Sequence, residues 1–235
     1  MEVALRARIP LILLETAEVT FCVRGVASPL LANIYMHRFI KAFRKYSLDR
    51  RYGAVLVTYA DDFVVLCRHD ADEVLATTRR WRVSIGLALN ETKTRVCNAR
   101  CESFDFLGYT FEPMYSPRTG GRYNGARPSR KAVASIKDNI RRRLRPGNQA
   151  PWEEVARDLN RTVRGWAAYF SYGSVSKARH AVQAHLYHGV RRFLRRRHKV
   201  AGSGYRQFPA ERVFGELGVL SFDATSRRRS AHACM

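Results

Sequence analysis

The chain has 235 residues, and 46% of them are apolar, which is enough for a buried core. It carries 42 Lys and Arg residues against 20 Asp and Glu residues, for a formal net charge of +22. Residues 9–14 form an apolar run of six near the N-terminus, too short for a membrane span of about 20 residues, and no cleavage site for a signal peptide follows. We therefore expect no membrane partner.

The first structural elements predicted along the chain are a helix and a hairpin. Residues 30–43 fit the helical period, with one apolar face formed by Leu30, Ile34, Phe39 and Phe43. The short β-branched runs at residues 54–58 and 63–67 predict two strands. The residues between the runs, Tyr59-Ala60-Asp61-Asp62, then lie at the turn of a hairpin.

Two adjacent aspartates at a hairpin tip repel each other, and a divalent cation offsets this by drawing both charges to one centre. Asp61 is therefore the predicted metal ligand and Asp62 a second, less direct one. The alternative is an ordinary Asp-rich turn. Tyr59, just before the pair, has two possible roles: it contacts a substrate, or it is an aromatic residue of the strand whose hydroxyl is exposed to water.

A second helix is predicted for residues 71–85, where Val74, Thr78, Trp81 and Ile85 recur at the helical period and Gly86 caps the end. Short strands follow. Residues 112–128 contain Pro113, Pro117, Gly120, Gly121, Gly125 and Pro128. This density of turn formers predicts an irregular linker.

The rest of the chain is expected to be helical and basic. Residues 128–235 hold 23 basic and 7 acidic side chains, against 19 and 13 in residues 1–127, so a polyanion such as RNA or DNA is the expected partner. Three apolar stripes at residues 133–144, 152–170 and 182–193 predict a small bundle with a basic outside. Trp152 and Trp166 fall on a stripe, which favours core packing over base stacking. The arginines expected to bind RNA are Arg141, Arg142, Arg143, Arg145, Arg191, Arg192, Arg195, Arg196 and Arg197.

Several segments resemble the reverse transcriptases encoded by group II introns, which also act as maturases. Tyr59–Asp62 is similar to their catalytic hairpin. Residues 25–35 (GVASPLLANIY), 86–94 (GLALNETKT) and 104–111 (FDFLGYTF) are similar to the palm motifs around it, and residues 159–170 (LNRTVRGWAAYF) to the maturase thumb. The motifs stand in the family's order and cover residues 25–220.

The resemblance implies an α+β fold, in which a partial polymerase palm with an antiparallel sheet precedes an all-α thumb or maturase bundle. It implies RNA-directed DNA polymerase chemistry with Mg²⁺. Asp61, Asp62 and Lys93 would be catalytic, with Asp61 and Asp62 as metal ligands. Tyr59, Ala60, Ser28 and Asn33 would bind substrate. On the residues alone, Lys93 can also be an exposed loop lysine, and Ser28 and Asn33 can serve local hydrogen bonds.

The sequence departs from the family before Gly25. Two-metal phosphoryl transfer needs carboxylates from separate strands, and the family takes the other aspartate from a strand ahead of this segment, whereas the first aspartate here is Asp49. Residues 21–24 read FCVR where the family has Thr-Pro-Gln-Gly. We therefore expect an unrelated leader at 1–24, a palm remnant at 25–112 with a bare sheet edge, a linker at 113–127, a thumb at 128–220 and a disordered tail at 221–235.

Three functions follow as hypotheses. The first is a truncated reverse transcriptase and maturase that binds group II intron RNA or template–primer duplex and cannot polymerise alone; a DNA target, and the missing N-terminal half supplied in trans, are further candidate partners. The second is a non-catalytic RNA-binding splicing factor, and the third an inactive mobile-element remnant. The five cysteines show no paired spacing for zinc. An odd number of cysteines without a secretion signal indicates that the protein works in a reducing cytoplasm. We expect this to be the cytoplasm of a bacterium.

Overall fold

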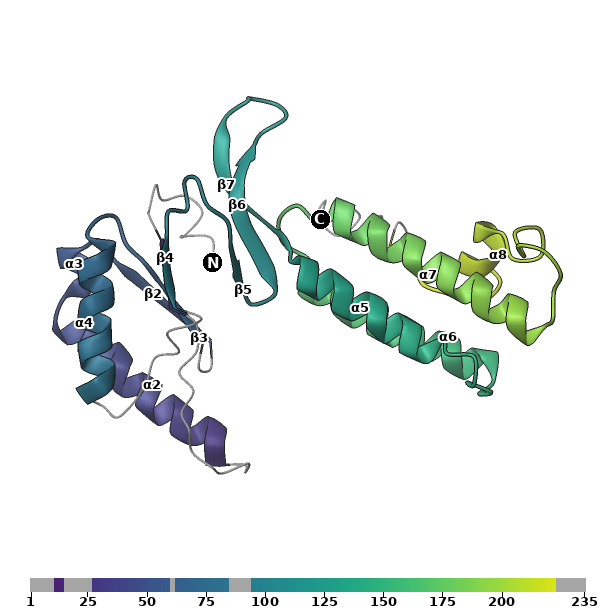
Figure 1. The fold of residues 1–235 in the computed structure, drawn as a ribbon, viewed down its shortest axis with the longest axis horizontal. Coiled ribbons are helices and arrows are strands. Elements are labelled where there is room, and N and C mark those ends of the chain that lie inside the picture. The colour runs from purple at the N-terminus through teal and green to yellow at the C-terminus, as the bar shows by residue number, and fades with distance from the viewer. Residues whose placement is uncertain (1–10, 15–26, 60–61, 85–93, 223–235) are drawn as a thin grey trace, which may run out of the picture. The chain divides into compact units, whose positions relative to one another are not determined.

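The fold is taken from a computed structural model, which describes residues 11–14, 27–59, 62–84 and 94–222. The chain divides into two compact units (Figure 1). Unit 1 comprises Met1–Phe104 with Phe111–Gly125, and unit 2 comprises Asp105–Thr110 with Ala126–Met235. The mixture of helices and small antiparallel sheets confirms the predicted α+β class.

Unit 1 contains a four-stranded antiparallel sheet in the order β2-β3-β1-β4. The strands are β1 (Leu11–Leu14), β2 (Val55–Tyr59), β3 (Asp62–Leu66) and β4 (Arg95–Cys97). The helices are α2 (Ala27–Lys45), α3 (Leu48–Arg51) and α4 (Ala71–Ser84). The predicted helices at 30–43 and 71–85 are thus confirmed to within a few residues, while the single turn of α3 is too short to leave a periodic pattern.

The core of unit 1 lies between the helices and one face of β3. Phe39 of α2, Phe63 and Val65 of β3, and Val74 of α4 are all fully buried in one cluster. The predicted place of Ile34 on this face is wrong, since its side chain is 50% exposed. Five residues separate it from Phe39, which is about 140° of helical rotation, so the two cannot share a face; Met36 takes the buried position instead.

The sequence predicted a bare sheet edge, and the structure shows that β3 is not an edge strand. β1 pairs with β3 from Leu11↔Leu66 to Leu14↔Phe63, and its other side pairs with β4. β2 pairs with the opposite side of β3. The first two dozen residues therefore supply an internal strand of the sheet, and β3 has a hydrogen-bonded neighbour on each side.

The segment predicted as an irregular linker instead contains regular strands. β5 (Phe104–Phe106), β6 (Tyr109–Tyr115) and β7 (Arg122–Pro128) form a three-stranded sheet in that order. Three of the six turn formers, Pro117, Gly120 and Gly121, lie at the tip between β6 and β7. There the Ser116 amide donates to the Gly121 carbonyl, and Gly120 has φ +63°. Gly125 lies within β7, where an added Cβ would come 2.3 Å from Met114 Sδ. The absence of a side chain at Gly125 therefore serves close packing rather than a turn.

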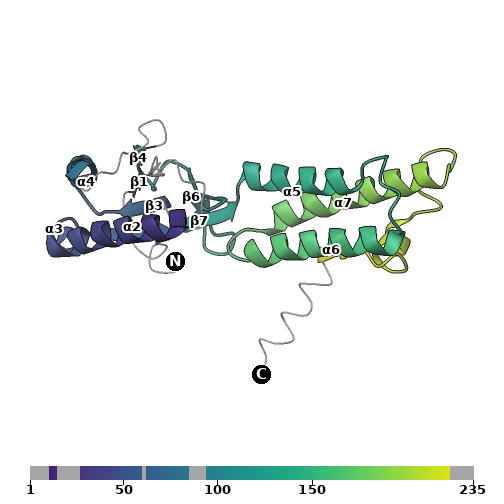
Figure 2. The same ribbon diagram turned by 90° about the horizontal axis from the view of Figure 1, so that it is seen from below.

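Unit 2 is a helical bundle of α5 (Arg130–Arg143), α6 (Trp152–Tyr169) and α7 (Ser176–Arg197), with the short α8 (Ala210–Phe214) beside them (Figure 2). The three predicted helices are confirmed. Ile140, Leu159, Val163, Leu186 and Val190 from the three stripes are fully buried in one core. Ser129 caps α5, since its hydroxyl accepts a hydrogen bond from the Ala132 amide.

Polar side chains of the bundle hold the segment after α8. The Trp152 indole donates to the Leu217 carbonyl at 3.0 Å, and the Asn160 amide donates to Gly218 and accepts from the Leu220 backbone, both at 2.7 Å. Gln183 accepts from the Phe222 amide at 2.8 Å. We call residues 217–222 the C-terminal strap. Trp152 and Trp166 both pack against the bundle core, as predicted.

Candidate catalytic hairpin and nucleic-acid interface

The predicted hairpin is confirmed by the register of β2 and β3. The two strands pair from Val55↔Leu66 to Tyr59↔Asp62. Tyr59 is 61% exposed, and Asp62 is half-buried directly before the fully buried Phe63. Burial of Phe63 therefore fixes the strand end that carries Asp62. Ala60 and Asp61, between the paired ends, lie outside the described residues.

The remaining site residues predicted for unit 1 are described only in part. Ser28 and Asn33 both lie on α2, and the Asn33 side chain is exposed. Lys93 lies outside the described residues. The geometry therefore places Tyr59 and Asp62 together at one end of the hairpin and leaves the other predicted contacts as predictions.

A two-metal centre needs carboxylates gathered at one place. Nowhere in the described ranges do three or more His, Cys, Asp or Glu side chains gather so that they could hold a metal ion. β1 is the neighbour of β3 opposite β2, and its described residues, Leu11–Leu14, are all aliphatic. A second carboxylate for a two-ion centre, which must come from a separate strand, is thus not provided by these residues. Asp62 is the only one of the two predicted metal ligands among the described residues, so the magnesium site stays a prediction.

The nine arginines predicted to bind RNA divide into three groups in unit 2. In the first group the guanidinium is used within the protein. Arg143 donates to the Asn139 carbonyl at 3.0 Å, and Arg195 donates to the Gly202 carbonyl at 2.8 Å. Arg191 stacks on the Tyr205 ring, 3.4 Å from its centroid, and lies 5.3 Å from that of Tyr187. These three arginines stabilise the bundle and its loops.

The second group is exposed but has a local partner. Arg141 pairs with Asp138 at 2.6 Å, and Arg142 donates to the Asn139 side chain. Arg197 donates to the Ala150 carbonyl at 2.8 Å. Exposed pairs of this kind contribute little to stability, so these side chains can exchange their partner for a phosphate at small cost.

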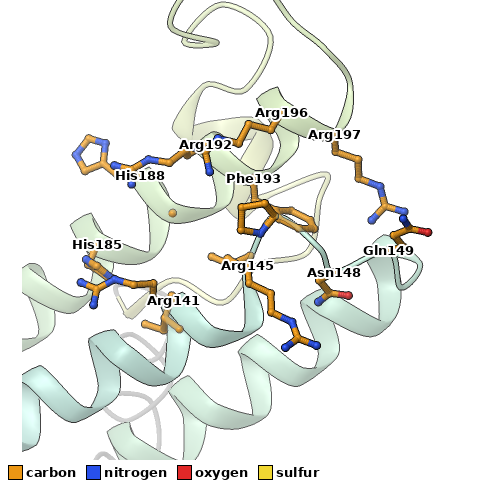
Figure 3. Close-up of a pocket in the computed structure, with 14 residues that line it drawn as sticks. Arg141, Arg145, Asn148, Gln149, His185, His188, Arg192, Phe193, Arg196 and Arg197 are labelled. Carbon is orange, nitrogen blue, oxygen red and sulfur yellow. The ribbon is translucent and has the colours of Figure 1, made fainter.

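The third group, Arg145, Arg192 and Arg196, is exposed and has no hydrogen-bond or ion-pair partner within the described part of the chain. All three line one pocket of about 720 Å³, together with Arg141 and Arg197 (Figure 3). We call it the basic pocket. It lies between the C-terminal end of α5, the loop that follows α5, and α7. No Asp or Glu lines it.

The floor of the basic pocket is apolar. Ile140 and Leu144 from α5 and Phe193 from α7 contribute to it. Gly189 allows α5 and α7 to approach here, because a Cβ at this position would come 3.0 Å from Leu144 Cδ1. In Figure 3 the Phe193 ring lies between Arg141 and His185 on one side and Asn148 and Gln149 on the other.

His185 adds a polar group to the wall of the basic pocket. Burial lowers its pKa below the usual value, and the nearby charges of Lys137, Arg141 and Arg192 lower it further, against a hydrogen bond to the Lys137 backbone that raises it. Its imidazole is therefore neutral at pH 7. Sequence reasoning identified the arginines but missed Asn148 and Gln149. The turn formers Pro146 and Gly147 come directly before these two residues and could have indicated a loop at the end of α5.

Comparison with known families matches both units. Residues 23–111 match the model for "Reverse transcriptase (RNA-dependent DNA polymerase)". Residues 133–213 match that for "Group II intron, maturase-specific domain". A search of curated proteins gave no match, and no described helix is both long and apolar enough to cross a membrane. The two matched families, in this order along one chain, show that the protein belongs to the reverse transcriptase/maturases of group II introns.

Proposed function

We propose that the protein holds structured RNA, either that of its group II intron or a template–primer duplex, along the basic helices of unit 2. Unit 2 then corresponds to the maturase thumb and unit 1 to the late palm. One observation carries the proposal: Arg145, Arg192 and Arg196 converge on one pocket without a partner among the described residues and without a carboxylate in its lining. Like charges held together in this way favour a polyanion.

Arginine suits this role because its planar guanidinium grips phosphate oxygens with two parallel hydrogen bonds. Structured RNA offers phosphates and 2′-hydroxyls across its wide minor groove, which proteins recognise mainly by shape. An exposed helix face can meet such a surface without deep insertion. We place the protein with this RNA in the bacterial cytoplasm, with a DNA target as a further substrate.

Filter binding with the full chain and an intron-like RNA tests RNA binding. If about six phosphates are neutralised, the logarithm of the association constant falls against the logarithm of salt concentration with a slope of about −4 to −5. Salt-independent binding, or none at low salt, contradicts the proposal.

Members of the reverse transcriptase family are RNA-directed DNA polymerases that generally use Mg²⁺. We propose that this chain does not polymerise by itself, since Asp62 stands beside a β1 whose described residues offer no carboxylate. A strand carrying a second carboxylate, supplied in trans, is the candidate partner for polymerisation. A primer-extension assay with Mg²⁺ is expected to give no product. Templated synthesis that disappears in Asp61→Ala would refute this.

A non-catalytic splicing role is the second candidate. The observation that favours it is that the partnerless arginines lie in unit 2, whereas the described residues of unit 1 form no metal cluster. An intron self-splicing assay separates the candidates: acceleration of splicing without primer extension supports the splicing factor. RNA binding without either activity would leave the inactive remnant.

A further inference from the structure

We propose that the basic pocket receives one unstacked nucleotide of a bulged or single-stranded RNA segment, with its phosphate on the arginines and its base over the apolar floor. This inference rests on the proposed RNA binding and specifies which part of the RNA is recognised. It assigns the pocket to a single-nucleotide contact within a larger, shape-based interface.

The charge on the walls requires an anion. Arg145 approaches from the end of α5, while Arg192 and Arg196 approach from α7. Each guanidinium carries five N–H donors, and none of these three has a partner among the described residues. Arg141 and Arg197 stand at the same pocket with exchangeable partners.

The size and floor of the pocket require more than a phosphate ion. A volume of about 720 Å³ lies within the range of pockets that enclose small organic ligands, about 300 to 1,000 Å³. Leu144 and Phe193 offer no hydrogen-bond groups from their side chains, so a phosphate alone would leave this part of the lining without a contact. A nucleotide combines an anion with a flat face of low polarity, which matches both parts of the pocket.

The pocket also offers groups to a base edge. Gln149 is exposed, and its amide both donates and accepts without a partner among the described residues. The neighbouring Asn148 amide is already used, because it donates to the Arg143 carbonyl at 2.8 Å and accepts from the Ala150 amide at 3.1 Å. Asn148 therefore shapes the loop, and Gln149 is available for the ligand.

A regular duplex cannot fill such a hollow. Its bases are stacked and paired inside the helix, and only a nucleotide released from the stack can enter a pocket and expose its base edge. Unstacked bases are often covered by a guanidinium or histidine plane, and Arg192 and the exposed His188 lie at the wall. The geometry therefore favours a bulge or a loop over continuous duplex.

The test compares two RNA hairpins of equal length and charge, one fully paired and one with a single-nucleotide bulge. The full chain carries either Arg145→Gln, Arg192→Gln and Arg196→Gln together, or a control set on α6, Arg157→Gln, Arg161→Gln and Arg164→Gln. Both sets remove three positive charges from exposed side chains of unit 2. Circular dichroism and thermal melting check that both variants fold as the wild type does.

We expect the wild type to prefer the bulged hairpin. The pocket variant should lose roughly tenfold or more of its affinity for the bulged hairpin, because charge-assisted contacts to phosphate are lost, and its preference should disappear. The control variant should keep the preference and lose less. Gln149→Ala should reduce the preference without changing the salt slope.

Two results would overturn the pocket assignment while leaving RNA binding intact. The first is an equal loss of affinity in the pocket and control variants, which would mean that total charge alone matters. The second is equal binding of both hairpins by the wild type. Failure of the wild type to bind either hairpin at low salt would instead remove the proposed function itself.

Discussion

A proline in β1 tests whether the N-terminal segment is an integral strand of unit 1. Ile12 lies opposite Val65 of β3 and opposite Val96 of β4. Since β1 has neighbours on both sides, the amide of every residue in it points to one of the two ladders. Ile12→Pro removes one such donor and places its ring against the neighbouring strand.

The expected loss of stability in Ile12→Pro follows from the hydrogen bonds of β1. A lost backbone hydrogen bond costs about 1 kcal/mol net, and the buried carbonyl left without a donor costs a further 1 to 3 kcal/mol. We therefore expect unit 1 to lose about 2 to 4 kcal/mol, a large share of the stability of a small domain. The matched control, Ile12→Val, keeps the amide and should lose less than about 1.5 kcal/mol.

Hydrogen exchange measured by mass spectrometry gives the readout. Peptides covering Asp62–Leu66 should exchange faster in Ile12→Pro than in Ile12→Val, because β3 loses its partner on that side. Peptides from α6 and α7 should keep their exchange rates. Unchanged protection of β3 in the proline variant would refute the assignment of β1 as an internal strand.

Three further predictions concern single residues. Asn160→Ala should release the C-terminal strap and cost about 1 to 3 kcal/mol in urea unfolding, because the Gly218 carbonyl and the Leu220 amide lose their partner; an unchanged midpoint would argue against the strap. A maleimide at pH 7 should modify the exposed Cys101 well before Cys67, whose burial raises its pKa to about 11; peptide mapping decides this, with Cys101→Ser as the control. Burial lowers the pKa of His185, so the unfolded chain binds more protons below about pH 6.5 and the contribution of His185 to stability, complete above that pH, is lost as the pH falls. His185→Gln should therefore show a smaller drop in melting temperature between pH 7.5 and 5.5 than the wild type, and an equal drop would contradict the reasoning.

The sequence predicted the parts of this fold that carry a strong period. The stripes through Ile140, Leu159 and Leu186 recur at helical spacing, and all three side chains are fully buried. The β-branched runs around Tyr59 and Asp62 predicted the hairpin, and the pairing of β2 with β3 confirms it. In each case a repeated local pattern agrees with the long-range packing.

The predictions from the sequence were wrong where contacts between distant residues outweigh the local sequence pattern. The four aliphatic residues Leu11–Leu14 form too short a run to distinguish a paired strand from a loose tail. The pairing with β3 and β4 shows that they form a strand. Gly125 was read as a turn former, although it serves a close contact with Met114. Composition could not separate an arginine that stacks on Tyr205 from one that faces solvent, because that depends on which loop returns to the helix.

Photo-crosslinking of the full chain to an intron-like RNA, followed by mass spectrometry of the linked peptides, tests the central claim most directly. We predict cross-links in the peptides around the basic pocket, residues 141–149 at the end of α5 and residues 185–197 on α7. The control set on α6 should leave these cross-links in place. Cross-links confined to unit 1, or absent while the RNA is bound, would contradict the account.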